Sequence, residues 1–143
     1  MRYNSKSVED TMSLARELAQ RANAGDIIAL SGELGAGKTA FAQGFAKGLG
    51  IQGHVVSPTF TIMQIYEGGR LPMYHFDLYR LEGAEFEEFE EVGLLEYLDD
   101  GPGVALVEWA EYAGDIIPDG AVWVEIRRSD DGGFTDGREI HIR

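Results

Sequence analysis

Hydrophobic positions recur at helical spacing along residues 8–22, which predicts an amphipathic helix in the first part of the chain. Ser7 and Asp10 have the spacing of an N-terminal capping box for this helix. The next apolar run, residues 27–30, is short and continuous, as expected for a strand buried on both faces. A second helix, with apolar residues on one face, is predicted over residues 38–49.

The pattern changes to that of strands after the second predicted helix. Residues 59–66 and 71–76 flank a glycine-containing tetrapeptide, which predicts a hairpin. Residues 85–92 then indicate an acidic helix, with Phe86, Phe89 and Val92 directed inward, and residues 94–98 add a further helical turn.

The last third of the chain contains a second buried-type strand and a terminal hairpin. The strand covers residues 104–107 and ends at Glu108, and the hairpin pairs residues 122–127 with 138–142 around a turn rich in Gly and Asp. The order of strand, glycine loop, helix and later apolar strand predicts an α/β fold, a three-layer P-loop NTPase fold. Its central sheet is expected to be mostly parallel with antiparallel hairpin additions, within a single domain spanning residues 1–143.

Residues 32–39 match the P-loop pattern G-x-x-x-x-G-K-[ST]. Glycines let the backbone curl so that successive N–H groups point at phosphate oxygens, and the following helix N-terminus adds its positive end. In such a loop Lys38 reaches the β- and γ-phosphates, and the Thr39 hydroxyl can ligate Mg²⁺. The guanine-reading pattern of GTPases is absent, which favours ATP. The predicted nucleotide contacts in the loop are Glu33, Leu34, Gly35, Ala36, Gly37, Lys38 and Thr39.

Two carboxylates end predicted strands and are candidate catalytic residues. Glu108 stands where P-loop proteins place the residue that holds Mg²⁺ or its water, although Asp is more usual there. If the strand of Asp77 lies beside the P-loop strand, Asp77 can face the γ-phosphate; the alternative is a cap on the following turn. His75 alternates with Asp77 and is expected to be a packed or hydrogen-bonded histidine. Trp109 is expected in the core rather than stacked on a nucleotide.

Two segments outside the P-loop have alternative interpretations. Residues 57–61, Ser-Pro-Thr-Phe-Thr, follow the P-loop helix, where a hydroxyl could sense the γ-phosphate or Mg²⁺; alternatively, Pro58 only sets the start of a strand. The acidic run 82–91 is either a solvated helix face or a partner-binding surface.

Charge and composition bear mainly on partners and location. The formal net charge is −13, from 25 acidic and 12 basic residues, so the surface repels phosphate backbones and tight direct binding of nucleic acid is not expected. The same negative charge is compatible with a basic protein partner. No cysteine is present, no apolar run approaches the roughly 20 residues of a membrane span, and the N-terminus lacks the apolar core of a signal peptide. We therefore expect a cytoplasmic protein without a membrane partner, and a monomer is favoured.

The ordered set of motifs resembles the TsaE family, also called YjeE. These are P-loop ATPases required in bacteria for forming threonylcarbamoyladenosine in tRNA. The resemblance covers nearly the whole chain and rests on four motifs, residues 32–39, 57–61, 75–80 and 106–109.

The resemblance implies a role for each matching residue. Lys38 and the P-loop backbone would bind phosphates, Thr39 and Glu108 would serve Mg²⁺, and Asp77 would lie at the nucleotide. It also implies a partner, the TsaB–TsaD complex, in which TsaD transfers the threonylcarbamoyl group. This chain would hydrolyse ATP slowly and reset or regulate that complex.

Two other functions fit a P-loop in so short a chain. A small phosphotransferase, or kinase, would need an acceptor site and cations that clamp the moving phosphoryl group. A nucleotide-binding adaptor would bind ATP without useful hydrolysis. Phosphate release in the absence of an acceptor distinguishes the three.

Overall fold

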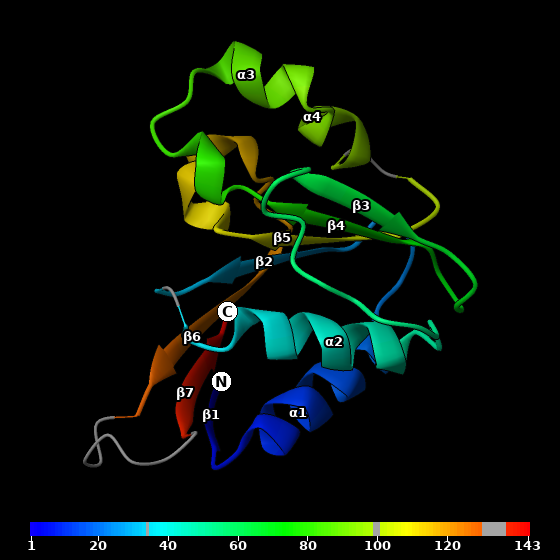
Figure 1. Cartoon of the computed structure of the whole chain (residues 1–143), viewed down its shortest axis with the longest axis vertical. Coiled ribbons are helices and arrows are strands. Elements are labelled where there is room, and N and C mark those ends of the chain that lie inside the picture. Colours follow the sequence, from blue (N-terminus) through cyan, green and yellow to red (C-terminus); the bar gives the residue numbers. More distant parts are fainter. Residues whose placement is uncertain (34, 99–100, 130–136) are drawn as a thin grey trace.

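The fold is built on one mixed sheet in the described part of a computed structural model, residues 1–33, 35–98, 101–129 and 137–143 (Figure 1). The strand order is β1-β7-β6-β2-β5-β4-β3. The four middle strands run parallel to one another, and the remaining three pair antiparallel with their neighbours. The parallel strands are β6 (Val122–Arg128), β2 (Ile27–Ser31), β5 (Val104–Glu108) and β4 (Met73–Asp77), and the antiparallel additions are β1 (Arg2–Ser5), β7 (Arg138–Ile142) and β3 (Met63–Tyr66). The predicted α/β fold is confirmed.

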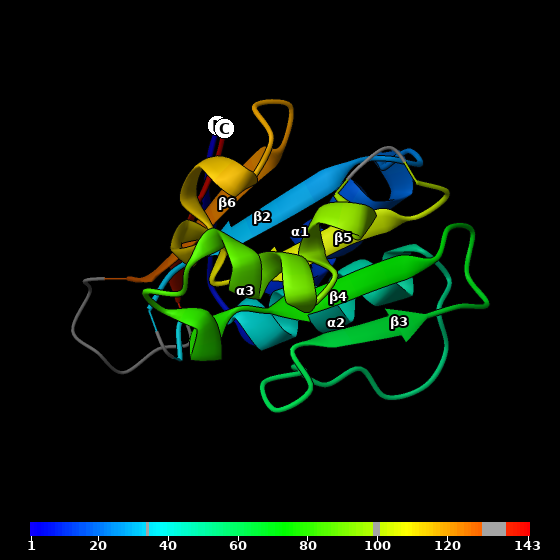
Figure 2. The same cartoon turned by 90° about the horizontal axis from the view of Figure 1, so that it is seen from above.

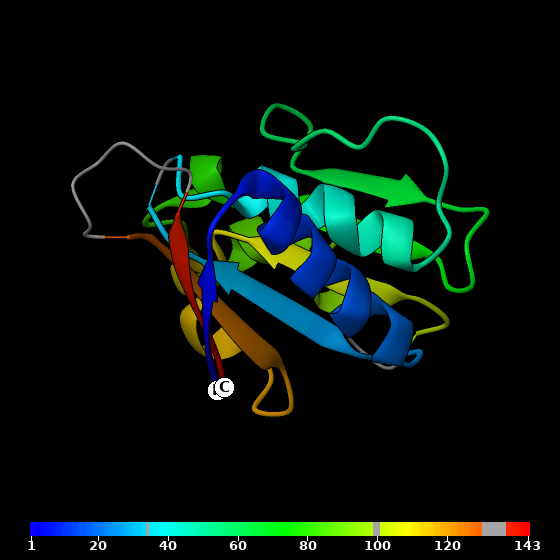
Figure 3. The ribbon, with the colours of Figure 1, turned by 90° about the horizontal axis from the view of Figure 1, so that it is seen from below.

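Helices cover the sheet on both faces. The helices α1 (Val8–Arg21) and α2 (Lys38–Gly48) pack on one face (Figure 3). The short helices α3 (Phe86–Glu91) and α4 (Leu94–Tyr97) lie on the other (Figure 2), together with the 3₁₀ helices after β5. The residues of β5 alternate between two apolar clusters, one under each helical layer, because successive side chains of a strand point to opposite faces. Burial on both sides is therefore the reason that this strand is continuously apolar.

The helices α1 and α2 approach each other closely through glycine. A Cβ at Gly44 would lie 2.3 Å from the carbonyl oxygen of Met12, and one at Gly48 would lie 2.5 Å from that of Arg16. Both distances are too short for a real side chain, so these glycines set the spacing of the two helices. No helix in the described ranges is long and apolar enough to cross a membrane.

The hairpin predicted over residues 59–76 forms, but its first strand begins later than expected. β3 starts at Met63, because the chain turns at residues 58–62: the N–H of Ile62 donates to the carbonyl of Pro58 at 2.6 Å, and Ile62 has a φ of 69°. This turn carries residues 57–61 away from the sheet edge and over the carboxyl ends of the strands.

Two other details differ from the sequence predictions. Phe86, predicted to face inward, is 51% exposed, whereas Phe89 one turn later is buried. The edge strand β1 was not predicted, because Arg2–Ser5 has no run of apolar residues and its stability comes from backbone pairing with β7. The Gly- and Asp-rich turn predicted before residue 138 falls on residues 130–136, which lie outside the described residues.

Candidate functional site

The carboxyl ends of the parallel strands β2, β5 and β4 meet at one edge of the sheet. Leu30 is paired with Glu108, and Glu108 with Asp77, so the P-loop segment (residues 32–39) begins beside Glu108, with Asp77 one strand further on. The premise that the strand of Asp77 lies next to the P-loop strand is wrong, because β5 lies between them. Asp77 nevertheless reaches the same site, because it is paired with Glu108 on the adjacent strand.

A cavity of about 420 Å³, here called the strand-end cavity, opens at this edge. It brings together most residues that the sequence singled out, and its lining also includes hydroxyl and aromatic side chains. The lining residues are Gly35, Gly37, Lys38, Thr39, Ser57, Thr59, Asp77, Tyr79, Glu108 and Trp109.

Three predicted P-loop contacts are placed differently from the rest. Ala36 is buried and does not line the strand-end cavity, and its N–H donates to the carbonyl of Glu33 at 3.1 Å. Glu33 is exposed and faces a second cavity instead. Leu34 lies outside the described residues.

The backbone of the P-loop needs glycine at specific positions. Gly35 and Gly37 have φ angles of 78° and 110°, in the left-handed region that side chains disfavour. Gly32 also has a positive φ, and a Cβ there would lie only 2.4 Å from the carbonyl oxygen of Ile126 in β6. The motif therefore encodes a curled loop that fits tightly against the neighbouring strand.

Arg138, from the start of β7, holds the outside of this loop. Its Nε donates to the carbonyl oxygen of Ala36 at 2.6 Å, and a terminal nitrogen lies 3.4 Å from that of Gly35. The sequence did not assign this residue a role. Arg138 is 102 positions from Ala36, so only the sheet order reveals the contact.

Lys38 is folded back into the protein. Its Nζ donates to the carbonyl oxygens of Gly32 and Glu33, the latter at 3.0 Å, and lies 3.8 Å from the ring centroid of Trp109. Burial lowers the pKa of Lys38, because water is withdrawn from the ammonium group; nearby carboxylates, Glu111 first, oppose that shift. Trp109 packs in the core as expected, and its ring also covers the lysine.

The two carboxylates are buried, and the Ser57 hydroxyl lies within hydrogen-bond distance of both, 3.1 Å from Asp77 Oδ2 and 2.7 Å from Glu108 Oε2. Glu108 Oε2 accepts a hydrogen bond from Ser57 Oγ at 2.7 Å and lies 2.6 Å from His75 Nε2. Asp77 Oδ2 accepts from Thr59 Oγ1 at 2.8 Å, and its Oδ1 accepts from the N–H of Tyr79 at 2.9 Å. The Tyr79 bond ties Asp77 to the turn after β4, although Leu78 is the N-cap of the 3₁₀ helix that follows. The exposure of Glu108 is 2%, which excludes a solvent-facing side chain.

The oxygen groups around the strand-end cavity suit Mg²⁺ better than a softer metal. Thr39, Ser57 and Thr59 offer hydroxyls, and Asp77 and Glu108 offer carboxylates. In the described part of the chain no group of three or more His, Cys, Asp or Glu side chains could hold a metal. Mg²⁺ needs no such cage, since it usually takes one or two protein ligands and completes its shell with water and phosphate oxygens.

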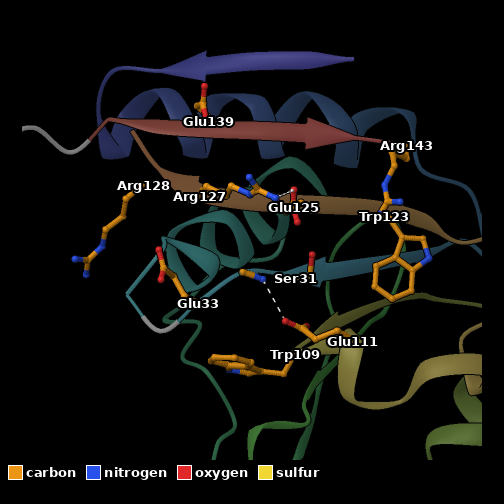
Figure 4. A pocket seen from close by; sticks show the side chains of 11 residues that line it. Ser31, Glu33, Trp109, Glu111, Trp123, Glu125, Arg127, Arg128, Glu139 and Arg143 are labelled. Atoms are coloured by element: carbon orange, nitrogen blue, oxygen red, sulfur yellow. Dashed lines mark hydrogen bonds and ion pairs between the residues drawn. The ribbon is translucent and has the colours of Figure 1, made fainter. Parts of the chain in front are cut away.

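A second cavity, of about 680 Å³, is lined in part by the start of the P-loop, at Gly32 and Glu33 (Figure 4). Trp123, Glu125 and Arg127 of β6 face it, and Trp109 and Glu111, at the 3₁₀ helix that follows β5, line the opposite side. Its acidic and basic side chains are mixed, with Glu125 and Arg127 paired at 3.2 Å. Neither Lys38 nor Thr39 lines it, so it lacks the two side chains that the motif predicts to contact phosphate and Mg²⁺.

Comparisons with known proteins agree on one family. The family model described as "Threonylcarbamoyl adenosine biosynthesis protein TsaE" matches residues 5–140. A tRNA threonylcarbamoyladenosine biosynthesis protein TsaE of Bacillus subtilis is 44% identical, over 98% of this chain and 83% of the relative. The protein of the same name from Treponema pallidum is 40% identical over 99% of both chains. The crystal structure of YdiB from Bacillus subtilis superposes with a TM-score of 0.81 at 40% identity, covering 98% of this chain and 82% of the other.

Proposed function

Because the chain belongs to the TsaE family of tRNA threonylcarbamoyladenosine biosynthesis proteins, we propose that it binds Mg²⁺ with ATP and hydrolyses ATP slowly, as an accessory protein of a TsaB–TsaD complex. The observation that carries the proposal is the strand-end cavity. It gathers a P-loop lysine, a hydroxyl at the start of α2 and two strand-end carboxylates from distant parts of the sequence.

In this proposal the P-loop backbone and Lys38 bind the phosphates. The ammonium group now satisfies the carbonyls of Gly32 and Glu33, so it can exchange these partners for phosphate oxygens without being exposed to bulk water. Thr39 and Glu108 would hold Mg²⁺, which when bound offsets the negative charge of the phosphates. Withdrawal from water strengthens these charge interactions, because the effective dielectric constant is lower in the cavity.

Hydrolysis needs a positioned water, and Glu108 and Asp77 are the groups to orient it. Both carboxylates are buried at the cavity, and each is anchored by a hydroxyl of residues 57–59. No arginine is found among the described residues that line the strand-end cavity. P-loop enzymes that lack such a cation hydrolyse slowly until one is supplied, commonly by a partner. The proposed activity is therefore weak for the isolated protein.

Docking to the partner is proposed to depend on bound nucleotide rather than on hydrolysis. The switch segment, residues 57–61, carries both hydroxyls that bind the carboxylates and Phe60, which is 86% exposed. A ligand that competes for Glu108 and Asp77 alters the position of this segment and so the surface that it offers. Partners would hold the tRNA, in keeping with the net charge of −13 and a cytoplasmic location.

The test is phosphate release from ATP by the purified protein without any acceptor, measured alone and with TsaB–TsaD. Slow release that TsaB–TsaD changes is the expected result. Release only when a phosphate acceptor is added indicates the kinase, and ATP binding without release in either condition indicates the adaptor. Surface-immobilised TsaB–TsaD with this protein injected in ATP, ADP or no nucleotide tests docking; equal affinity in all three states refutes the nucleotide dependence.

A further inference from the structure

His75 lies in the middle of β4 with no exposed surface, and it contacts the strand-end carboxylate of the next strand. Its Nε2 lies 2.6 Å from Glu108 Oε2, although the two residues are 33 positions apart. Apolar packing alone would not select histidine at this position, since an aliphatic side chain fills a core without introducing polar atoms. The polar contact with Glu108 is the feature that distinguishes this residue.

The hydrogen-bond partners assign the proton of the imidazole ring. An ionised carboxylate oxygen can only accept, so with Glu108 ionised Nε2 carries the hydrogen of this contact. The other ring nitrogen, Nδ1, has no hydrogen-bond partner in the part of the chain that the structure describes. Among the described residues Nδ1 lacks a partner in either tautomer, but a proton on Nδ1 alone would direct the Nε2 lone pair at a carboxylate lone pair, and the two would repel. The contact therefore favours the tautomer protonated at Nε2.

Both hydrogen bonds to Glu108 fall on the same oxygen. Ser57 Oγ and His75 Nε2 are the partners of Oε2, and Oε1 accepts no hydrogen bond from the described residues. Ser57 belongs to the exposed switch segment, whereas His75 is held in the sheet and flanked by the ring of Tyr66, at 6.3 Å between centroids. The histidine bond is thus the one that persists if the switch segment moves.

We infer that His75 is a positioning residue, which fixes the Glu108 carboxylate through Oε2 and leaves Oε1 for a ligand in the strand-end cavity. The inference rests on the proposed function, because it assumes that Glu108 serves Mg²⁺ and ATP. Carboxylates that ligate metals are commonly held by such outer hydrogen bonds, whose removal costs 10–100-fold in metal affinity or activity. His75 itself touches neither the metal nor the nucleotide.

Two amide substitutions separate positioning from packing. The side-chain nitrogen of glutamine is as many bonds from Cα as Nε2 of histidine, whereas that of asparagine is one bond shorter and matches Nδ1. His75→Gln therefore keeps a donor within reach of Glu108, and His75→Asn, with the same chemistry, does not. The measurement is the affinity for Mn²⁺, as a probe of the Mg²⁺ site, by electron paramagnetic resonance in the presence of a non-hydrolysable ATP analogue. kcat and KM for ATP hydrolysis are measured in parallel.

We expect His75→Asn to weaken Mn²⁺ binding or lower kcat by about 10–100-fold, with His75→Gln within about threefold of wild type. Equal impairment of the two variants, or wild-type behaviour of His75→Asn, overturns the positioning role. The ¹⁵N chemical shifts of the His75 ring in the wild-type protein provide a test that needs no nucleotide. A proton on Nε2 is expected, and a proton on Nδ1 alone overturns the inference. If the wild-type protein fails to bind Mg²⁺ with ATP, the proposed function fails, whatever the variants and the ring shifts show.

Discussion

Replacing Lys38 by methionine tests the proposed phosphate site most directly. Methionine keeps most of the length and apolar volume of lysine, so the variant removes mainly the charge and three donors. Lys47, on the same helix but exposed and outside the strand-end cavity, provides the matched control Lys47→Met.

The expected loss of ATP affinity follows from the contacts that Lys38 can make. A hydrogen bond to a charged group is worth about 1.5–3 kcal/mol, and about 1.4 kcal/mol corresponds to a tenfold change in Kd. One or two such bonds to phosphate oxygens therefore predict that Lys38→Met weakens ATP binding by about 10-fold to more than 100-fold. Calorimetric titration with ATP and Mg²⁺ measures this. Lys47→Met should bind as the wild type does.

The fold should survive the substitution, because the buried charge has opposing effects on the free energy of unfolding. In the wild type the ammonium group donates hydrogen bonds to the carbonyls of Gly32 and Glu33. It also lies over the ring of Trp109, a contact worth about 0.5–2 kcal/mol. Against these contacts stands the cost of burying the charge, which is the first cause of the lowered pKa. We therefore expect Lys38→Met to change the free energy of unfolding by no more than about 2 kcal/mol near neutral pH.

The pH dependence of stability provides an independent check. The pKa of Lys38 is lowered in the folded protein from 10.5, so between the lowered pKa and 10.5 the unfolded chain binds more protons. The stability contributed by this group therefore rises with pH through that window, by at most about 1.4 kcal/mol per pH unit. Urea unfolding followed by circular dichroism should show wild type gaining stability relative to Lys38→Met as pH increases toward 10.5. Unchanged ATP affinity in a folded Lys38→Met variant, or a stability difference that falls with pH, would refute the reasoning.

Three further changes test the proposed catalytic carboxylate, the packing of α1 on α2 and the proposed interface. Glu108→Ala should cut phosphate release at least about tenfold, or 1.4 kcal/mol of transition-state stabilisation, while weakening ATP binding less than Lys38→Met does; release at the wild-type rate would make Glu108 structural. Gly44→Ala should lower the free energy of unfolding in urea by about 1–3 kcal/mol, since the overlap with the α1 backbone outweighs a gain of roughly 1 kcal/mol in helix propensity. Gly120→Ala, which meets nothing within 4 Å, is the control, and equal effects of the two would exclude the steric argument. Reversing Glu87 and Glu88 to Lys should slow association with TsaB–TsaD, most at low salt, in surface-binding measurements; rates that depend on neither charge nor salt would remove α3 from the interface.

The sequence by itself determined the local structure around the proposed phosphate site. At Gly35 and Gly37 the backbone is encoded locally, because their positive φ angles are readily adopted by glycine and disfavoured by residues with a side chain. The helix that follows and the buried strand before it are likewise readable from hydrophobic spacing. The resemblance to the family was evident from four short motifs, because their order and spacing can be read directly along the sequence.

Only the tertiary structure decided which of these pieces meet. The order of strands places β5 between β2 and β4, a fact that no local pattern contains, because parallel neighbours are joined by long crossovers. The contacts of His75 with Glu108 and of Arg138 with the carbonyl of Ala36 join residues 33 and 102 positions apart. Such contacts depend on the register of the strands and on the direction of the side chains. Both are determined only when the whole core packs together. The hydrophobic pattern therefore predicts that the carboxylates lie at strand ends. Only the folded structure shows which side chains hold them there.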